Sequence, residues 1–325
     1  MKKNFLVTTS ITETWEFNEN NFLLGKWCEF YEFEDFGKKG LKEKISKVNI
    51  TKNSYQLENK EKKIKDYEYV KEKLEYLLEV ISEKLSLIHD VKEDKEYWRV
   101  IISNWLSEYI TVFFDRWEMI RTFFEKNKTE KFYSNYILFD DLNFISKNHI
   151  DFGKNVQKEE WNHWVFFRIL NYLNISNLSL IEKKFTKKDF NNKHDLSGSI
   201  NAIKIVDNLI SKLAFKFNKV IFESFYFPKK EYLKICLRCN LIPSRYSNFF
   251  NFNIKENTKS KNNIRHRLKD LLIKTNHQDK FIQFLLMNIH KDIPQSYLEN
   301  FKLIKRKVLP FAKRKKVIFS MHSII

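Results

Sequence analysis

Glycine is scarce in this chain, with five in 325 residues, and this scarcity excludes the common nucleotide-binding loops. Walker loops and dinucleotide-binding turns place glycines at fixed spacings, so that backbone N–H groups can approach a phosphate at the start of a helix. No stretch of the sequence carries either spacing. The sequence therefore predicts no phosphate-binding loop, and its motifs indicate no bound cofactor.

Cysteine is also rare, and the three present, Cys28, Cys236 and Cys239, favour a reduced compartment. An odd number without disulfide spacing is typical of intracellular proteins. Cys236 and Cys239 form a lone CLRC motif, but no second pair completes four zinc ligands, so no metal site is predicted. The N-terminal run MKKNFLVTTSITETW has only three consecutive apolar residues, so we expect no signal peptide and a cytoplasmic protein.

Acidic residues are too few to balance the basic ones, and the formal net charge is +18. Lysine outnumbers arginine 49 to 10, whereas recognition of phosphate or guanine favours the bidentate arginine fork. We therefore interpret most of the charge as solvated surface and do not expect nucleic acid as the main partner.

The basic excess is concentrated in the last quarter of the chain. Residues 254–325 contain 17 Lys and Arg against five Asp and Glu, a net charge of +12. Segments 259–269 and 302–316 are suited to contact phosphate, an acidic sugar or the anionic headgroups of a membrane surface. An equally good interpretation is that they form the solvent-facing sides of charged helices.

Aromatic residues, in contrast, are abundant: the chain has 31 Phe, 14 Tyr and 7 Trp within a hydrophobic content of 43%. A chain of this composition buries a large core and is not disordered. Its length suits one large domain or two ordinary ones.

The stretch from 94 to 126 contains no Gly or Pro and predicts a single helix with Asp94 as its N-cap. Apolar residues occur on nearly every face, so the helix must be enclosed by protein or lipid. Charged residues interrupt it before about 18 uncharged residues accumulate, which excludes a membrane span. We therefore expect a buried structural ion pair among Arg99, Asp115 and Arg116, or alternatively a charged floor under a ligand cleft.

Short apolar runs alternate with helical segments along the chain, which favours an α/β fold. We expect strands at 5–8, 22–24, 135–139, 219–223 and 317–319, and helices at 66–89, 94–126, 159–173, 199–217, 229–239, 262–275, 277–290 and 295–307. The strands at 5–8, 22–24 and 219–222 are predicted to share one parallel sheet in a three-layer, Rossmann-like arrangement. The polar residues 36–62 are interpreted as a loop.

Several tryptophan-bearing segments carry a resemblance to a known family: LVTTSITETW (6–15), FLLGKWCEFY (22–31), YWRVIISNWL (97–106), FDRWEMI (114–120), WNHW (161–164) and FPKKEYLKICLRCNLIP (227–243). In this order they resemble the N-terminal part of a transferase family found in O-antigen and surface-carbohydrate biosynthesis clusters. That family is similar to glycosyltransferases of the two-Rossmann, GT-B-like type. The segments are scattered over about three quarters of the chain. Ser103 and Asn104 stand where the family has a Gly-Pro pair.

The resemblance implies that residues 1–253 form an acceptor-side domain with a helical insertion at about 62–126. Residues 254–325 are then a basic helical segment ending in an apolar strand. In GT-B-like enzymes a C-terminal domain binds the nucleotide-sugar, which is a co-substrate, and the resemblance places that domain after the strand at 317–319. We therefore expect a half-enzyme for surface polysaccharide, acting on a saccharide or lipid-linked saccharide acceptor and associating with itself or with a separate C-terminal half.

Candidate acceptor-binding residues follow the predicted strands, because ligands of open α/β sheets bind beyond the carboxyl ends of the strands. This rule selects Thr8, Thr9, Glu13, Trp27, Ser224 and His322, and Trp15 beside Glu13 is a further acceptor-binding candidate. The competing class of function is a basic module without enzymatic activity that binds nucleic acid or an anionic membrane surface.

Glu13 and His163 are the candidate general bases. Glu13 follows the first strand near the apolar wall of Trp15, which can raise a carboxyl pKa, although it can equally be an exposed loop glutamate. His163 lies in the WNHW segment, where it can serve a saccharide site or be held within the aromatic core. The adjacent Asp140 and Asp141 are interpreted as a turn, since neighbouring strand side chains point to opposite faces.

We predict that residues 1–325 alone bind no nucleotide-sugar and show no turnover, because the chain has no glycine-rich phosphate loop and the resemblance places donor binding beyond residue 325. Calorimetry with UDP-, GDP- and CMP-sugars, combined with product analysis on lipid-linked acceptors, checks this. Saturable heats together with product formation would contradict it.

Overall fold

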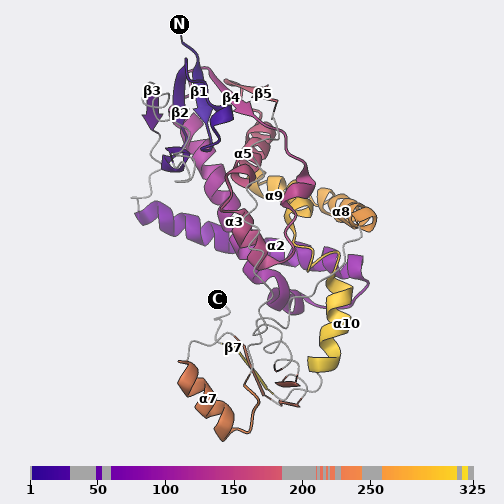
Figure 1. Cartoon of the computed structure of the whole chain (residues 1–325). Coiled ribbons are helices and arrows are strands. Elements are labelled where there is room, and N and C mark those ends of the chain that lie inside the picture. Colours follow the sequence, from indigo (N-terminus) through magenta and orange to yellow (C-terminus); the bar gives the residue numbers. More distant parts are fainter. Residues whose placement is uncertain are drawn as a thin grey trace. The chain divides into compact units, whose positions relative to one another are not determined.

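The chain forms two compact units, residues 1–187 with 260–298 and residues 188–259 with 299–325. The computed structural model describes residues 2–29, 49–52, 60–184, 210, 213, 214, 217, 218, 220–223, 228–243, 258–312 and 317–320. Figure 1 labels the elements along the chain. The domain boundary at residue 253 stays a prediction.

A five-stranded parallel sheet organises the first unit. Its strands are β1 (Asn4–Val7), β2 (Asn20–Leu23), β3 (Asn49–Lys52), β4 (Phe132–Tyr136) and β5 (Leu178–Glu182), in the order β3-β2-β1-β4-β5. Each neighbouring pair is parallel. This order is that of a Rossmann-like sheet, in which the direction of winding reverses between β1 and β4. The predicted α/β class is confirmed.

Two long helices join β3 to β4 and form a hairpin, α2 (Lys60–His89) and α3 (Lys95–Lys126). The Asp94 carboxylate accepts a hydrogen bond from the Tyr97 N–H at 2.8 Å, which confirms the predicted N-cap. Trp98 and Trp105 of α3 are fully buried, whereas Val100 is 73% exposed. The helix is therefore enclosed on most faces and meets solvent on one.

Aromatic side chains attach α3 to the sheet. Phe123, near the end of α3, lies 5.1 Å between ring centroids from Phe132 of β4, and Phe22 of β2 lies 5.1 Å from the same ring. Because strand side chains alternate, Tyr136 shares this face with Phe132, and its ring stacks on Phe167 at 4.3 Å. This face is therefore covered by α3 and by the helix that carries Phe167.

That helix is α5 (Glu159–Leu173), and it connects β4 to β5 together with η4 (Asp141–Phe144) and α4 (His149–Asn155). It ends at Asn174, whose left-handed backbone (φ 44°) closes the last turn. Later in the chain, α8 (Thr258–Ile273) and α9 (Lys280–Asp292) add to the first unit, and α9 buries most of its apolar residues.

An ion pair inside the core joins α5 to α9. The Arg168 guanidinium donates two hydrogen bonds of 3.1 Å to the two carboxylate oxygens of Asp292, and the side chains are 6% and 2% exposed. The guanidinium also lies 3.5 Å from the ring centroid of Trp164 and 5.2 Å from that of Phe113. Tyr109 of α3 donates its hydroxyl to Asp292. Burial raises the pKa of Asp292, and the positive charge of Arg168 opposes that rise.

The second unit contains a separate two-stranded parallel sheet, β6 (Val220–Glu223) beside β7 (Val317–Ser320). Its described helices are α7 (Lys229–Arg238) and α10 (Phe301–Ala312). The prediction that 219–222 shares a sheet with 5–8 and 22–24 is therefore wrong. A short apolar run predicts a buried strand, but it carries no information on which strand it pairs with.

Two strands of the first sheet were not predicted, and the bounds of a third differ from the prediction. The interpretation of 36–62 as a loop missed β3, whose sequence NITK has too few apolar residues to stand out. The strand β5 was also missed, and β4 starts three residues before the predicted 135–139. The predicted helix 199–217 lies almost entirely outside the described residues.

Asp292→Ala is expected to lower the free energy of unfolding by about 3–5 kcal/mol, because Arg168 would remain charged and buried without its partner. The matched control is Asp115→Ala, which breaks a pair whose acid is 33% exposed and should cost about 1 kcal/mol or less. Urea unfolding at pH 7 measures both. A smaller loss for Asp292→Ala than for Asp115→Ala would contradict this expectation.

Candidate functional site

The candidate functional site lies at the carboxyl ends of β1 and β4, where the winding of the sheet reverses. Ligands of open α/β sheets bind in the crevice outside this point, because the loops after the two strands diverge there. The loop after β1 starts with Thr8 and Thr9, and the loop after β4 starts with Ile137. The structure therefore places two predicted acceptor residues at the position that this rule selects.

Three hydrogen bonds fix the loop after β1. The indole N–H of Trp27 donates to the Thr8 carbonyl at 2.9 Å, and the indole N–H of Trp15 donates to the Thr9 carbonyl at 3.2 Å. The Ser10 N–H donates to a carboxylate oxygen of Glu159, at the start of α5, at 2.9 Å. The predicted residues Trp15 and Trp27 thus hold the loop in one conformation.

Trp27 takes its position because of a glycine two residues before it. A Cβ atom on Gly25 would lie 1.8 Å from Cζ3 of the Trp27 ring, so only glycine leaves room for the indole. On η2 (Lys26–Glu29), the ring is half-buried and lies parallel to Phe166 of α5, with centroids 6.3 Å apart. Trp27 therefore connects α5 to the loop after β1.

His163 of α5 joins the two loops. Its Nε2 accepts a hydrogen bond from the Ile137 N–H at 3.0 Å, so the proton of the neutral ring is assigned to Nδ1, which lies 3.4 Å from the Thr9 hydroxyl. Burial lowers the pKa of His163 to about 4. The ring is therefore neutral near pH 7 with both nitrogens engaged, a geometry that positions the loops. The catalytic role of His163 stays a prediction.

The carboxylates around the site differ in exposure. Glu13, on η1 (Thr12–Thr14), is exposed to solvent and receives a weak 3.4 Å contact from the Thr12 hydroxyl. Glu16 accepts hydrogen bonds from Asn135 of β4 and from Lys183, just after β5. Of these two acids, Glu13 is the more exposed.

Sequence reasoning missed Glu16, Glu159 and Lys183. Glu159 is 149 residues from Ser10, and Lys183 is 167 residues from Glu16, so no local spacing could pair them. The WNHW segment was the available signal, because Glu159 stands two residues before it on the same helix.

The predicted ion pair forms only between Asp115 and Arg116. Arg116 Nη1 lies 2.9 Å from Asp115 Oδ2, and its remaining nitrogens donate to Asn162 near the start of α5. Burial raises the pKa of Asp115, an effect that Arg116 opposes. Arg99 instead binds Glu75 of α2 through two hydrogen bonds of 2.6 and 2.7 Å. These charges connect helices, and the alternative of a charged floor under a ligand cleft stays a prediction.

The remaining candidates are Ser224, His322, the two cysteines of the CLRC motif and Asp141. Ser224 and His322 are outside the described residues. Cys236 is buried and Cys239 exposed, and both are free thiols. Within the part of the chain that the structure describes, no three metal-ligating side chains converge. Asp141 starts η4 and accepts a hydrogen bond from the indole N–H of Trp164 at 3.0 Å.

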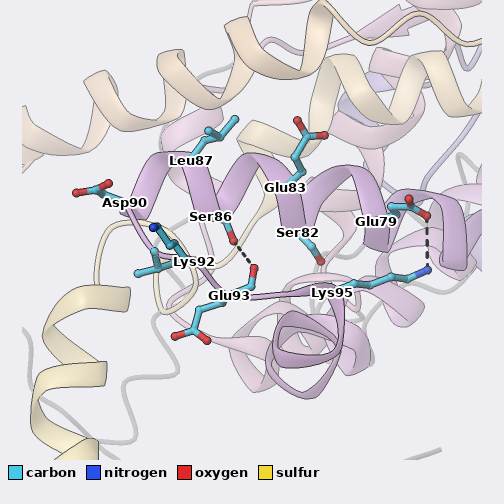
Figure 2. A pocket seen from close by; sticks show the side chains of 10 residues that line it. Glu79, Ser82, Glu83, Ser86, Leu87, Asp90, Lys92, Glu93 and Lys95 are labelled. Carbon is cyan, nitrogen blue, oxygen red and sulfur yellow. Dashed lines mark hydrogen bonds and ion pairs between the residues drawn. The ribbon is translucent and has the colours of Figure 1, made fainter.

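A hollow of about 460 Å³ lies at the turn of the α2–α3 hairpin (Figure 2). Its lining contains four acids, Glu79, Glu83, Asp90 and Glu93, and two lysines, Lys92 and Lys95. The excess of acids is opposite in sign to the charge of the whole chain. Because such a surface repels phosphate, we do not place a nucleotide there.

Comparison with known proteins gives one family. A family model described as LIC12162 family transferase matches residues 4–325. No curated protein and no solved structure matches the chain. The family match spans both units and includes every residue of the candidate site.

The burial of His163 predicts a pH dependence of stability. Because its folded pKa of about 4 lies below the ordinary value of 6.5, the unfolded chain takes up a proton first as the pH falls, and stability is lost between about pH 6.5 and pH 4. Between pH 7 and pH 5 this amounts to about 2 kcal/mol. His163→Gln keeps an acceptor for the Ile137 N–H but removes the titrating group. Between pH 7 and pH 5, the free energy of unfolding of this variant, measured with urea, should therefore fall by about 2 kcal/mol less than that of the wild type. Equal losses would contradict the assignment.

Proposed function

Since this chain belongs to the LIC12162 family of transferases, we propose that it takes part in glycosyl transfer to a saccharide acceptor held at the carboxyl edge of its parallel sheet. The observation that carries the proposal is the loop after β1. Two tryptophans, Glu159 and His163 fix this loop at the switch point, while Glu13 stays exposed. A loop fixed in this way is preorganised for a ligand and loses little entropy on binding.

In this proposal Glu13 is the general base. Its carboxylate takes the proton of an acceptor hydroxyl while the hydroxyl oxygen forms a bond to the anomeric carbon of the donor sugar. The bond from that carbon to the nucleoside diphosphate breaks, and the diphosphate leaves with the electron pair. The nucleotide-sugar is thus a co-substrate, as in GT-B-like enzymes. Glu16 is less suited to this role, because Lys183 and Asn135 both donate to its Oε1 and its side chain is less exposed.

The loop after β1 and the Trp27 indole beside it form the proposed acceptor site. Thr8 and Thr9 are themselves buried, so their role is to shape the loop rather than to face solvent. Trp27 is half-buried, and its indole is the aromatic surface beside the loop on which a sugar ring can pack. The acceptor we favour is part of a surface polysaccharide such as O-antigen, assembled in the cytoplasm.

A lipid-linked acceptor would bring the protein to an anionic membrane surface, and segments 259–269 and 302–316 are the proposed contacts. Arg267 of α8 and Lys302 and Arg306 of α10 are exposed, and the latter two lie one helical turn apart. Arg265 is buried and donates to the carbonyls of His290 and Ile293, so it takes no part. Within the described ranges no helix has the length and apolarity to cross a membrane.

The test is genetic and uses the protein in its own cell. Deletion of the gene should alter the surface polysaccharide on gels and in composition, and the wild-type gene should restore it. Glu13→Gln should fail to restore it, because loss of a general base lowers the rate by about 10²–10⁴-fold.

The matched control is Glu19→Gln, an acid six residues away on the same connection whose carboxylate accepts from the Lys3 N–H. It should restore the polysaccharide as wild type does. An unchanged polysaccharide after deletion, or full restoration by Glu13→Gln, would overturn the proposal. If the deletion strain instead loses a process that depends on nucleic-acid binding, a basic module without enzymatic activity is favoured.

A further inference from the structure

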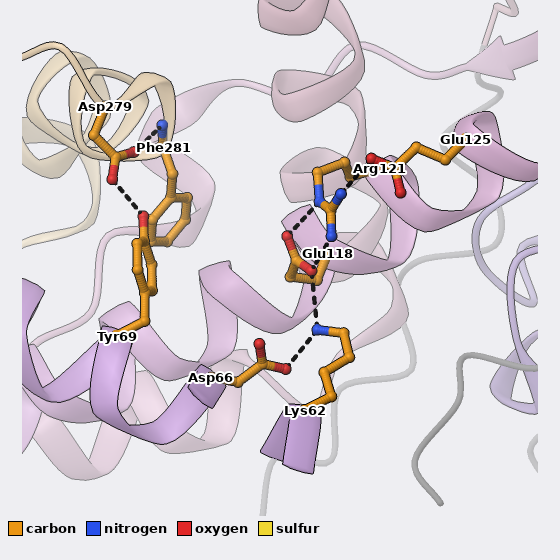
Figure 3. Close-up of polar contacts among 8 residues, drawn as sticks. All are labelled: Lys62, Asp66, Tyr69, Glu118, Arg121, Glu125, Asp279 and Phe281. Atoms are coloured by element: carbon orange, nitrogen blue, oxygen red, sulfur yellow. Dashed lines mark hydrogen bonds and ion pairs between the residues drawn. The ribbon is translucent and has the colours of Figure 1, made fainter. Parts of the chain in front are cut away.

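A groove of about 870 Å³ lies on the helical part of the first unit, apart from the sheet edge. It is lined by the first turns of α2, the second half of α3, the last residue of α5 and the start of α9. Figure 3 shows the polar contacts that cross it, from Lys62 and Asp66 to Glu118 and Arg121. Its size is that of a small-molecule site.

Aromatic residues form one side of the groove. The Phe114 ring packs against Tyr69 at 5.0 Å and against Phe281 at 5.5 Å between centroids. Trp117 and Phe281 are buried and support this side, whereas Phe114 is only partly buried and keeps ring surface for a ligand. Such a surface suits the C–H face of a pyranose ring.

Four charged side chains on the other side form one network. Arg121 donates to both oxygens of Glu118 at 2.7 Å, and Lys62 bridges Glu118 at 3.1 Å and Asp66 at 2.6 Å. Burial acts to raise the pKa of Glu118, but Arg121 and Lys62 outweigh it and lower the pKa, so the Glu118 carboxylate stays ionised at neutral pH.

The numbers of acidic and basic side chains in the lining indicate which kind of ligand the groove can bind. The lining contains four acids, Glu61, Asp66, Glu118 and Asp279, and four bases, Lys62, Lys65, Arg121 and Lys280, in a chain of net charge +18. At the network itself, an anion would compete with Glu118 for Arg121, and a cation would compete with Lys62 for the carboxylates. A neutral hydroxyl can instead add a hydrogen bond to a carboxylate such as Asp66, which has spare lone pairs, without breaking a pair.

We propose that the groove formed by α2, α3 and α9 is a binding site for an uncharged saccharide, with Phe114 under the sugar ring and the Lys62–Asp66–Glu118–Arg121 network along its hydroxyls. This site goes beyond the proposed transfer reaction, because it holds no group assigned to that chemistry. It would retain a glycan on the protein surface while the reacting end lies elsewhere.

The experiment is saturation-transfer-difference NMR on the full chain, with neutral trisaccharides (maltotriose, cellotriose, chitotriose and mannotriose) and acidic ones (sialyllactose and trigalacturonic acid) as probes. We expect saturable binding of at least one neutral probe. Phe114→Leu keeps an apolar side chain but removes the ring, and should weaken that binding at least fivefold.

The matched control is Tyr67→Leu, which removes a 67% exposed aromatic side chain of α2 that is not part of the lining. It should bind as wild type does, and so should Glu13→Gln, so that failure of the transfer proposal leaves this one standing. Binding of none of the neutral probes, preference for an acidic probe, or equal losses in Phe114→Leu and Tyr67→Leu would each overturn it.

Discussion

The buried pair between Arg168 and Asp292 is the interaction on which the arrangement of the first unit depends. Two charges removed from water are tolerated only when each finds the other in good geometry, and here both carboxylate oxygens are engaged by one guanidinium. The pair fixes α5 against α9, and the rings of Trp164 and Phe113 enclose the cation. Since α5 also carries His163 and Glu159, the same constraint sets the position of the sheet-edge loop.

The site and the core therefore share one helix. One end of α5 holds the loop after β1 through Glu159 and His163, and its last residue, Leu173, lines the groove on the helical part. Phe167 and Phe166 between these points pack on Tyr136 and Trp27. A rigid element placed in this way holds chemistry-bearing groups at fixed distances, which is what positioning a ligand requires.

Local sequence features predicted where helices and strands lie better than they predicted which elements contact one another. The absence of Gly and Pro between 95 and 126, with Asp94 before it, was sufficient for α3. The rule on strand ends selected Thr8, Thr9 and Trp27, which the structure brings together in and beside the loop after β1, while their role as acceptor-binding residues stays a prediction. The Arg168–Asp292 pair joins residues 124 positions apart, and β6 pairs with β7 near the end of the chain. Such contacts depend on the closed fold and leave no periodic signal in the sequence.

One feature of the chain order bears on how the protein is made. Residues 260–298, which supply α9 and Asp292, belong to the first unit although much of the second unit is synthesised before them. During translation α3 and α5 therefore leave the ribosome with Arg168 unneutralised and their aromatic faces uncovered until α9 follows. Such an intermediate exposes apolar surface for seconds, which favours its binding by chaperones. The order of synthesis thus makes completion of the core a late event in biogenesis.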